Sequence, residues 1–115
     1  MKKLLTILTI LFIVFPAQAQ YLEEYEAYDV DTNTVFYTMK DTQTGVTIAE
    51  GTFVNKKKSG IWYQYYPSGK IQFVQVYNGG VKTGTWKSWD SKGRVSSKLV
   101  YKKGKLVSST VLRYY

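Results

Sequence analysis

A 24-residue spacing between matching glycines and aromatic residues constrains the fold of this 115-residue chain more than any other feature. Six pairs of positions share the spacing, and in each pair both positions hold a glycine or both hold an aromatic side chain. The pairs are Gly60 and Gly84, Trp62 and Trp86, Tyr65 and Trp89, Gly69 and Gly93, Tyr77 and Tyr101, and Gly80 and Gly104. A fixed period of this length is typical of repeat architectures, in which each unit stacks on its neighbours.

The repeat extends toward the N-terminus in a weaker form. Gly45 and Phe53 each lie 24 residues before a partner of the same kind, whereas Thr38 occupies the position of the tryptophan. Terminal repeats are often atypical because they cap the stack, so we expect about three units with a degenerate first one.

Each unit is predicted to be a β-hairpin. Residues 61–66 are rich in aromatic and β-branched side chains, and residues 67–69 supply proline, serine and glycine for a turn. Residues 70–77 alternate as a strand does, and the Asn-Gly-Gly of residues 78–80 is a second turn signal. The sequence therefore predicts an all-β protein, an elongated antiparallel meander of stacked hairpins with a 24-residue period.

The aromatic pairs inside the strands leave one question about their faces. Trp62 and Tyr65 are three residues apart, as are Trp86 and Trp89, so a regular strand would point the members of each pair to opposite faces. Either a β-bulge realigns each pair, or both faces of the sheet are partly covered.

The N-terminus has the form of a secretory signal peptide over residues 1–19. Two lysines follow Met1, residues 4–15 are apolar, and residues 17–19 have the Ala-x-Ala pattern of a cleavage site. The apolar stretch is too short for a transmembrane helix, which needs about 20 residues. An uncleaved anchor and a buried core helix are the alternatives. We expect an exported protein, periplasmic or secreted, that does not span the membrane once this leader is removed.

Charge divides the rest of the chain into an acidic lead and a basic remainder. Residues 20–50 carry seven acids against Lys40, and residues 51–115 carry thirteen lysines and arginines against Asp90. This asymmetry indicates either an anionic partner or docking of the two halves on each other, with a solubilising surface as the alternative. The expected organisation is the leader at 1–19, the acidic lead at 20–35 and the repeat domain at 36–115.

Three tyrosines of the acidic lead, Tyr21, Tyr25 and Tyr28, are spaced four and three residues apart, which would place them on one side of a helix. An edge strand and a loose tail fit so short a segment equally well. We expect the tyrosines to pack on the sheet and the carboxylates to face lysines of the repeats.

The two complete units, residues 60–77 and 84–101, resemble the bacterial MORN-repeat variant family. The shared order is glycine, one residue and tryptophan, then aromatic residues, a turn ending in glycine, and a strand that begins with lysine or arginine and ends in tyrosine before a glycine turn. The positions that carry the resemblance are Gly60, Trp62, Gly69, Tyr77, Gly84, Trp86, Gly93, Tyr101 and Gly104.

The resemblance covers roughly residues 45–106. It implies an elongated single sheet that serves as a binding or scaffolding surface. Some relatives are labelled antitoxins, and eukaryotic MORN proteins are often linked to membrane lipids and protein assembly. The chain departs from the family pattern at Thr38 and at Lys56, which stands where later units have Gly80 and Gly104. Export also departs from the antitoxin role, because an antitoxin meets its toxin in the cytoplasm.

Catalytic chemistry is not expected. Histidine and cysteine are absent from the sequence, which removes the commonest general base, the thiol nucleophile and the usual transition-metal ligands. The one acid of the repeats, Asp90, begins a turn that ends at Gly93, where its side chain is expected to cap backbone amides. Ser96, Ser97 and the serines at 108 and 109 have no nucleophile elbow around them. We expect no enzyme activity, no cofactor and no metal.

The candidate binding residues are lysines in successive inter-hairpin loops, which a meander stacks along one edge. They are Lys56, Lys57, Lys58, Lys82, Lys102 and Lys103. Such a basic ridge would attract an anionic partner in a salt-dependent way. The alternative is a solvated edge that prevents aggregation.

The repeated aromatic residues are expected to form a ladder in the core, with an exposed strip for sugars or proteins as the alternative. Nucleic acid is not an expected partner of an exported protein. The sequence thus predicts an exported, non-catalytic binding or scaffold module that contacts an anionic envelope surface through its basic ridge. The alternative is an antitoxin-like or immunity-type protein-interaction module that uses an aromatic face or a sheet edge.

Overall fold

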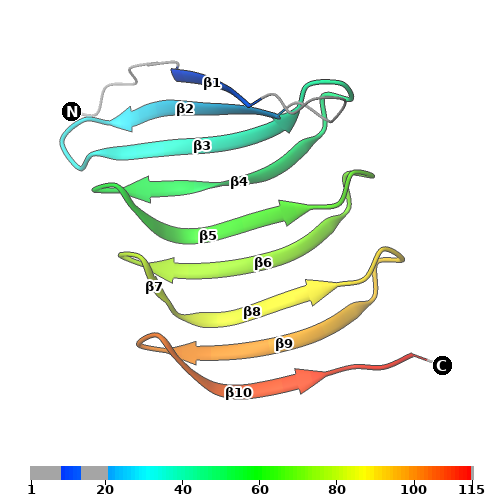
Figure 1. Ribbon diagram of the computed structural model, residues 1–115. Helices are drawn as coiled ribbons and strands as arrows, with labels where there is room; N and C mark the ends of the chain where they lie inside the picture. Colours follow the sequence, from blue (N-terminus) through cyan, green and yellow to red (C-terminus); the bar gives the residue numbers. More distant parts are fainter. Residues whose placement is uncertain (1–8, 14–20, 115) are drawn as a thin grey trace.

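The computed structural model describes residues 9–13 and 21–114, which form one antiparallel β-sheet (Figure 1). The strands are β1 (Thr9–Ile13), β2 (Tyr21–Asp29), β3 (Thr34–Asp41), β4 (Thr47–Val54), β5 (Lys57–Tyr65), β6 (Ile71–Asn78), β7 (Val81–Lys82), β8 (Gly84–Trp89), β9 (Val95–Lys102) and β10 (Lys105–Val111). They lie in chain order across the sheet, except that the two-residue β7 pairs with β6 beside the main path. The predicted all-β antiparallel meander is therefore confirmed.

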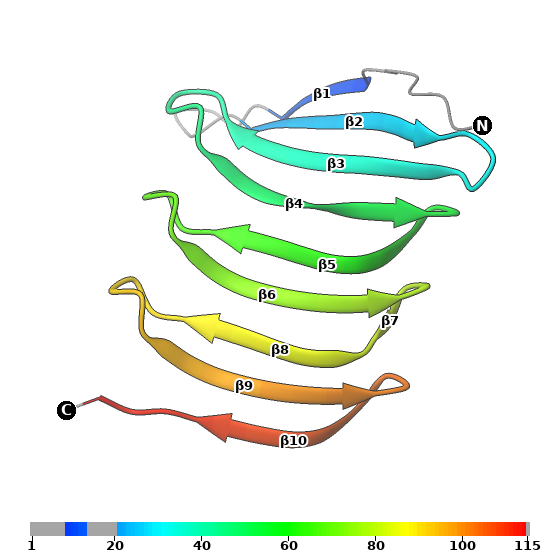
Figure 2. The same ribbon diagram turned by 180° about the vertical axis from the view of Figure 1, so that it is seen from behind.

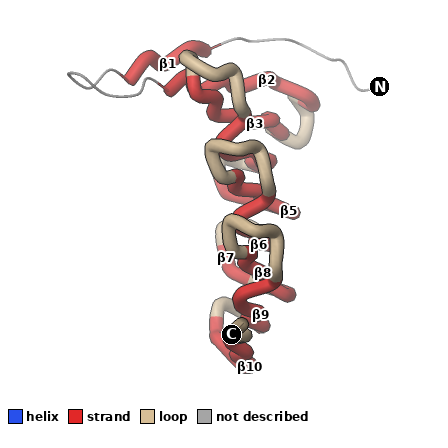
Figure 3. The backbone as a smooth tube through the Cα atoms, turned by 90° about the vertical axis from the view of Figure 1, so that its right-hand side faces the viewer, coloured by secondary structure: helices blue, strands red, loops and turns tan. Residues whose placement is uncertain are grey.

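The sheet is open and one layer thick. The view from behind shows the same succession of strands from β1 to β10 (Figure 2), and the edge-on view shows them stacked in a single file (Figure 3). No helix lies in the described ranges. Because no second layer covers the sheet, no large side chain of the described residues is completely buried. Stability must come from contacts between neighbouring strands.

Aromatic side chains form the core on one face, which we call the tryptophan face. Trp62 is 6% exposed and Trp86 is 9% exposed. The indole nitrogen of Trp62 donates to the carbonyl of Thr52 at 3.1 Å, and that of Trp86 donates to the carbonyl of Val76 at 3.0 Å. A buried N–H without a partner is costly, so these bonds favour one placement of each ring. Both tryptophans are therefore core side chains and not an exposed strip.

Other rings extend this core across the tryptophan face. One group of ring contacts joins Tyr25, Tyr37, Phe53 and Trp62. A second group joins Tyr77, Trp86 and Tyr101. Centroid separations of 5.0 to 6.4 Å in these groups lie in the range of favourable aromatic pairs.

Gly51 in β4 lies directly against the ring of Trp62. A Cβ atom added to Gly51 would lie 2.1 Å from Cδ2 of Trp62, well inside contact distance. The register of β4 on β5 shifts between Glu50 and Thr52, at the position of Gly51. A glycine is required here because the indole occupies the space of a side chain.

The opposite face of the sheet also carries aromatic side chains. Tyr65 stacks on Tyr63 at 6.3 Å between ring centroids, and its hydroxyl donates to the carboxylate of Glu50. The register of β5 on β6 shifts between Gln64 and Tyr65, but this bulge does not bring Tyr65 to the face of Trp62. For residues 62 and 65 the second alternative therefore holds: the two side chains lie on opposite faces, and both faces of the sheet are partly covered.

The acidic lead is an integral strand of the sheet. β2 pairs with β3 along its whole length, so the helical alternative for this segment is wrong. The strand separates its tyrosines: Tyr25 packs on Tyr37, whereas Tyr28 stacks on Phe36. Phe36 and Tyr37 are adjacent in β3 and point to opposite faces.

Carboxylates of the lead have partners within the first strands. Glu24 forms an ion pair with Lys40 of β3 at 3.6 Å. Glu23 accepts the hydroxyl of Tyr37 at 2.8 Å and that of Tyr25 at 3.3 Å. The expected contact with lysines of the repeats is thus found at Lys40, in the degenerate first unit.

Part of the predicted leader forms the first strand. β1 pairs with β2 in an antiparallel register that joins Thr9 to Tyr25 and Ile13 to Tyr21. The expected cleavage site at residues 17–19 lies outside the described residues. The signal peptide therefore stays a prediction.

Candidate binding edge

Tight turns with positive φ position the predicted lysines along one edge of the sheet. Both Asn55 and Lys56 have positive φ, at 51° and 65°. Gly79 with Gly80, and Lys103 with Gly104, have the same left-handed backbone. Two successive positive φ values characterise the type I′ hairpin turn, whose twist matches that of the flanking strands. Lys56 therefore adopts the backbone of the glycines that replace it in later units, at some conformational cost.

Hydrogen bonds link each of these turns to the strand or turn before it. The amide of Asn55 donates to Asn33 at 3.0 Å, and that of Gly80 donates to Lys58 at 2.8 Å. The amide of Gly104 donates in the same way to Lys82 at 3.0 Å. The turns consequently form one row, seen at the left of Figure 1.

All six candidate lysines lie on this row. Five are exposed, and Lys58 is half-buried. We call the row the basic edge and define it by Lys56, Lys57, Lys58, Lys82, Lys102 and Lys103. This edge is the side of the sheet formed by the turns at the strand ends, and it differs from the outer strands β1 and β10. The structure places these residues along one side of the sheet, and their role in binding stays a prediction.

Two members of the basic edge reach back over the tryptophan face. Lys58 Nζ lies 4.8 Å from the ring centroid of Trp62 and 5.1 Å from that of Tyr77. Lys82 Nζ lies 4.9 Å from Trp86 and 5.1 Å from Tyr101. Each ammonium group can make cation–π interactions with two rings. Lys58 and Lys82 thus have a structural role, and Lys58 connects the two groups of rings.

The sequence contained a signal for these contacts. Lys58 precedes Trp62 by four residues, and Lys82 precedes Trp86 by four. Residues separated by an even number lie on the same face of a strand, so each lysine shares a face with its tryptophan. Lys58 and Lys82 thus differ from the other four lysines of the basic edge, and charge alone does not indicate this difference.

The remaining lysines of the edge differ in their surroundings. Lys56 lines a shallow apolar depression of about 230 Å³ together with Tyr25, Val35 and Phe53. The stem of Lys57 lies near Gly80, where an added Cβ would be 3.7 Å from Lys57 Cβ. Lys102 and Lys103 are exposed at the last turn. Four ammonium groups therefore remain at the surface of the edge without an aromatic contact among those described.

A further pair of lysines was missed by the sequence analysis. Lys87 in β8 and Lys98 in β9 are directly opposite in the register. Like charges at such positions repel, so this pair adds positive potential on the face opposite the tryptophans. Lys87 follows Trp86 by one residue, so strand alternation places the two side chains on opposite faces. This pattern is the sequence signal that could have identified the position of Lys87.

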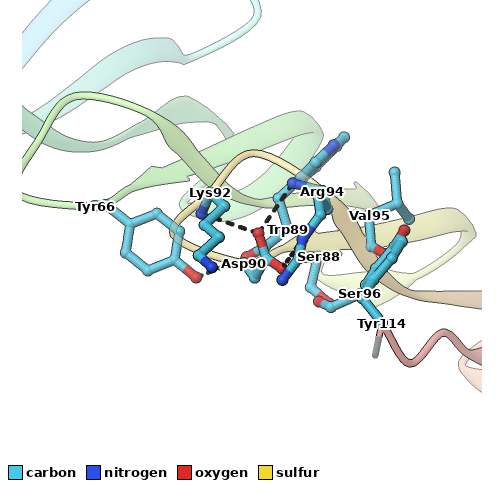
Figure 4. A network of polar contacts seen from close by, with 9 residues as sticks. All are labelled: Tyr66, Ser88, Trp89, Asp90, Lys92, Arg94, Val95, Ser96 and Tyr114. Carbon is cyan, nitrogen blue, oxygen red and sulfur yellow. Dashed lines mark hydrogen bonds and ion pairs between the residues drawn. The ribbon is translucent and has the colours of Figure 1, made fainter.

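Asp90 stabilises a turn at the other edge of the sheet, as the sequence predicts. One oxygen of its carboxylate accepts the amide of Lys92 at 2.9 Å and that of Arg94 at 3.0 Å. The other accepts Nε of Arg94 at 2.9 Å (Figure 4). Hydrogen bonds from the Arg94 backbone, and then from its side chain and Lys92, lower the pKa of Asp90. The expected capping role is confirmed.

The serines near this turn bond to each other. The hydroxyl of Ser88 is 2.7 Å from that of Ser96 and 2.6 Å from that of Ser97. Ser96 and Ser97 are half-buried, whereas Ser108 and Ser109 in β10 are exposed. Serine hydroxyls satisfy one another here because β8 and β9 place them side by side.

The Tyr65–Glu50 contact provides a titratable group whose environment is set by the fold. Burial, and then the hydrogen bond and charge of Glu50, raise the pKa of Tyr65 to about 12. Because this pKa exceeds the ordinary value of 10.0, the stability from this group is complete below about pH 10 and is lost as the pH rises toward about 12.

We expect Glu50→Gln to lower the pKa of Tyr65, because the charge that opposes ionisation is removed while burial remains. Ultraviolet absorbance of tyrosinate during an alkaline titration measures the change. The part of the absorbance change that disappears in Tyr65→Phe is the part that belongs to Tyr65. A band near pH 12 that survives Tyr65→Phe would show that another tyrosine produces it.

No three aspartate or glutamate side chains in residues 9–13 and 21–114 are grouped so that they could hold a metal ion. Nor do these residues contain a helix long and apolar enough to cross a bilayer. Comparison of the chain with protein-family models, curated proteins and solved structures finds no match.

Proposed function

We propose that the chain is an exported, non-catalytic binding module whose MORN-like hairpins present the basic edge to an anionic component of the cell envelope. The observation that carries the proposal is the row of linked turns, which gathers Lys56, Lys57, Lys102 and Lys103 on one side of the sheet. Charged groups that the fold already holds near one another lose less entropy on binding a ligand than groups that must first be brought together. The leader at 1–19 supports the cellular location.

The contacts that recur along the sheet support the MORN-like reading. Trp62 and Trp86 donate to carbonyls ten residues earlier, and Lys58 and Lys82 cover the corresponding rings. These pairs lie 24 residues apart in the sequence. A regular scaffold of this kind repeats its surface groups at regular distances, as a binding surface for a polymer or a membrane requires.

Co-sedimentation with vesicles tests the proposal. The protein is expected to sediment with phosphatidylglycerol vesicles at low salt and to be released at high salt, because the Debye length falls from about 8 Å at 0.15 M to about 3 Å at 1 M. Phosphatidylcholine vesicles are the control, and purified cell wall is a second anionic target. Equal retention on both lipids, or no retention on any anionic material, would contradict the proposal.

Removal of the leader is measured separately. The mass of the protein recovered outside the cytoplasm is expected to correspond to a chain that begins at Gln20. A mass that includes residues 1–19 would contradict the export part of the proposal and leave the binding result unaffected.

A second candidate function is protein interaction through a sheet edge, and the exposure of β10 favours it. Every residue of β10 is exposed, including Leu106, Val107 and Val111. Exposed edge strands with apolar side chains pair readily with other strands.

A further inference from the structure

The two ends of the sheet differ in what covers their outer strands. β10 pairs with β9 alone among the described strands, so the outer side of its backbone has no strand beside it. β2 would be the other outer strand, but Thr9–Ile13 pairs along it. This covering strand belongs to the predicted leader at 1–19, and its loss would leave β2 open.

We propose that, once the leader is removed, β10 of one copy pairs with β2 of a second copy, so that the chains assemble head to tail into a continuous sheet. The inference rests on leader removal, which is part of the proposed function, and it does not depend on the anionic ligand. While residues 1–19 are attached, β1 occupies the acceptor edge and keeps the chain monomeric.

The β10 edge has few of the features that normally prevent strand pairing. Between Lys105 and Arg113 it contains no charged residue and no proline. Val107 is 54% exposed and Val111 is 66% exposed. A register shift interrupts β10 between Leu106 and Ser108, but residues 108–111 pair regularly with β9. Natural edges usually carry inward-pointing charges, prolines or short strands instead.

Strand directions allow the proposed pairing without rotation of the second copy. Every neighbouring pair along the main path is antiparallel, so β1 and β10, eight steps apart, run in the same direction. A copy translated along the sheet therefore brings its β10 to the place of β1, in the direction that β1 has. The pairing of β1 with β2 shows that this edge accepts a strand in that direction.

Charge favours pairing of unlike edges over pairing of like edges. β2 carries four acids and no base, whereas residues 95–111 carry four lysines and no acid. The acids are Glu23, Glu24, Glu26 and Asp29, and the lysines are Lys98, Lys102, Lys103 and Lys105. Two β2 strands would bring their carboxylates together, which opposes their association, whereas β10 meets the acids of β2 with Lys105 and the lysines of the neighbouring strand and turn. Each copy also keeps one free edge after pairing, so growth continues beyond a dimer.

Sedimentation velocity on two chains tests the inference. A chain that begins at Gln20 is expected to increase in mass with concentration and to pass the mass of a dimer, with weaker association at high salt. The full-length chain is expected to remain a monomer over the same concentrations. A shortened chain that stays monomeric, or that stops at a dimer, would overturn the inference.

A full-length variant provides the same test without a truncation. Ile10→Pro and Leu11→Pro are introduced together, because adjacent residues of a strand point their N–H groups to opposite sides and one of the two faces β2. Release of β1 is expected to let this variant assemble as the shortened chain does. Circular dichroism establishes that both chains retain the sheet, and a folded variant that remains monomeric would contradict the inference.

A charge exchange identifies the edges that pair. The shortened chain with Lys98→Glu and Lys105→Glu, and the shortened chain with Glu24→Lys and Glu26→Lys, are each expected to remain monomeric. An equimolar mixture is expected to assemble, because the carboxylates introduced beside β10 of one chain then meet the ammonium groups introduced in β2 of the other. A mixture that stays monomeric would overturn head-to-tail pairing. Vesicle binding by these variants is measured separately, since none of the four positions belongs to the basic edge.

Discussion

Trp62→Ala is expected to lower the free energy of unfolding by about 3–5 kcal/mol, the usual cost of removing a large aromatic side chain from a core. The indole is 6% exposed, contacts Tyr37 and Phe53, and donates a hydrogen bond to Thr52. Small domains have a total stability of about 5–15 kcal/mol, so much of the sheet's stability depends on this ring. Urea denaturation followed by circular dichroism measures the loss. Trp89→Ala is the control, because Trp89 is half-buried and should cost less.

Gly51 makes the same prediction more specific. Gly51→Ala alone is expected to destabilise the fold by about 1–3 kcal/mol, because its methyl group overlaps the Trp62 ring. In the Trp62→Ala background the same substitution is expected to cost little, since the overlapping ring is gone. The difference between the two costs is the coupling energy of a double-mutant cycle. Equal costs in both backgrounds would show that Gly51 matters for some other reason than space under the indole.

Replacing Lys56, Lys57, Lys102 and Lys103 by glutamine is expected to weaken binding to anionic vesicles by roughly a thousandfold, because each lysine near such a surface contributes about 1 kcal/mol. All four side chains are exposed, so the fold should be little affected. Vesicle titration measures the affinity.

A control variant removes the same amount of charge elsewhere. Lys70, Lys87, Lys92 and Arg113 lie outside the basic edge, and their replacement by glutamine also lowers the net charge by four. This variant should retain most of the affinity. Equal losses in the two variants would mean that binding follows the overall charge of +8 and not the arrangement of the basic edge.

The fold was predictable from the sequence where local chemistry decides the backbone. Glycine turns such as those at Gly69 and Gly93 have positive φ, and the strands between them alternate as expected. Asp90 caps its turn because a carboxylate two residues before an amide needs no distant partner. The strand state of residues 21–29 was left open, because the spacing of Tyr21, Tyr25 and Tyr28 fits several structures and the neighbouring strand β3 decides among them.

The candidate site was only partly predictable. Hairpin length placed all six lysines on one edge, but their separate surroundings depend on contacts between strands. Lys58 lies over rings from two different strands, β5 and β6, and charge pattern alone does not encode this. The contact of Gly51 with Trp62 likewise depends on a register shift that no local signal in the sequence indicates. The exposure of β10 at the outside of the sheet cannot be predicted without knowledge of the strand order.

The row of linked turns has a consequence for distance. Successive turns of the basic edge are two strands apart, and neighbouring strands are separated by about 4.8 Å, so the turns recur at a pitch of about 10 Å. The exposed lysine pairs of the first and last turns are therefore about 20 Å apart. The edge is therefore a molecular ruler, and a polymer whose negative groups share that pitch would meet one turn at each step. Insertion of a further hairpin would add one turn to the basic edge and leave the spacing between turns unchanged.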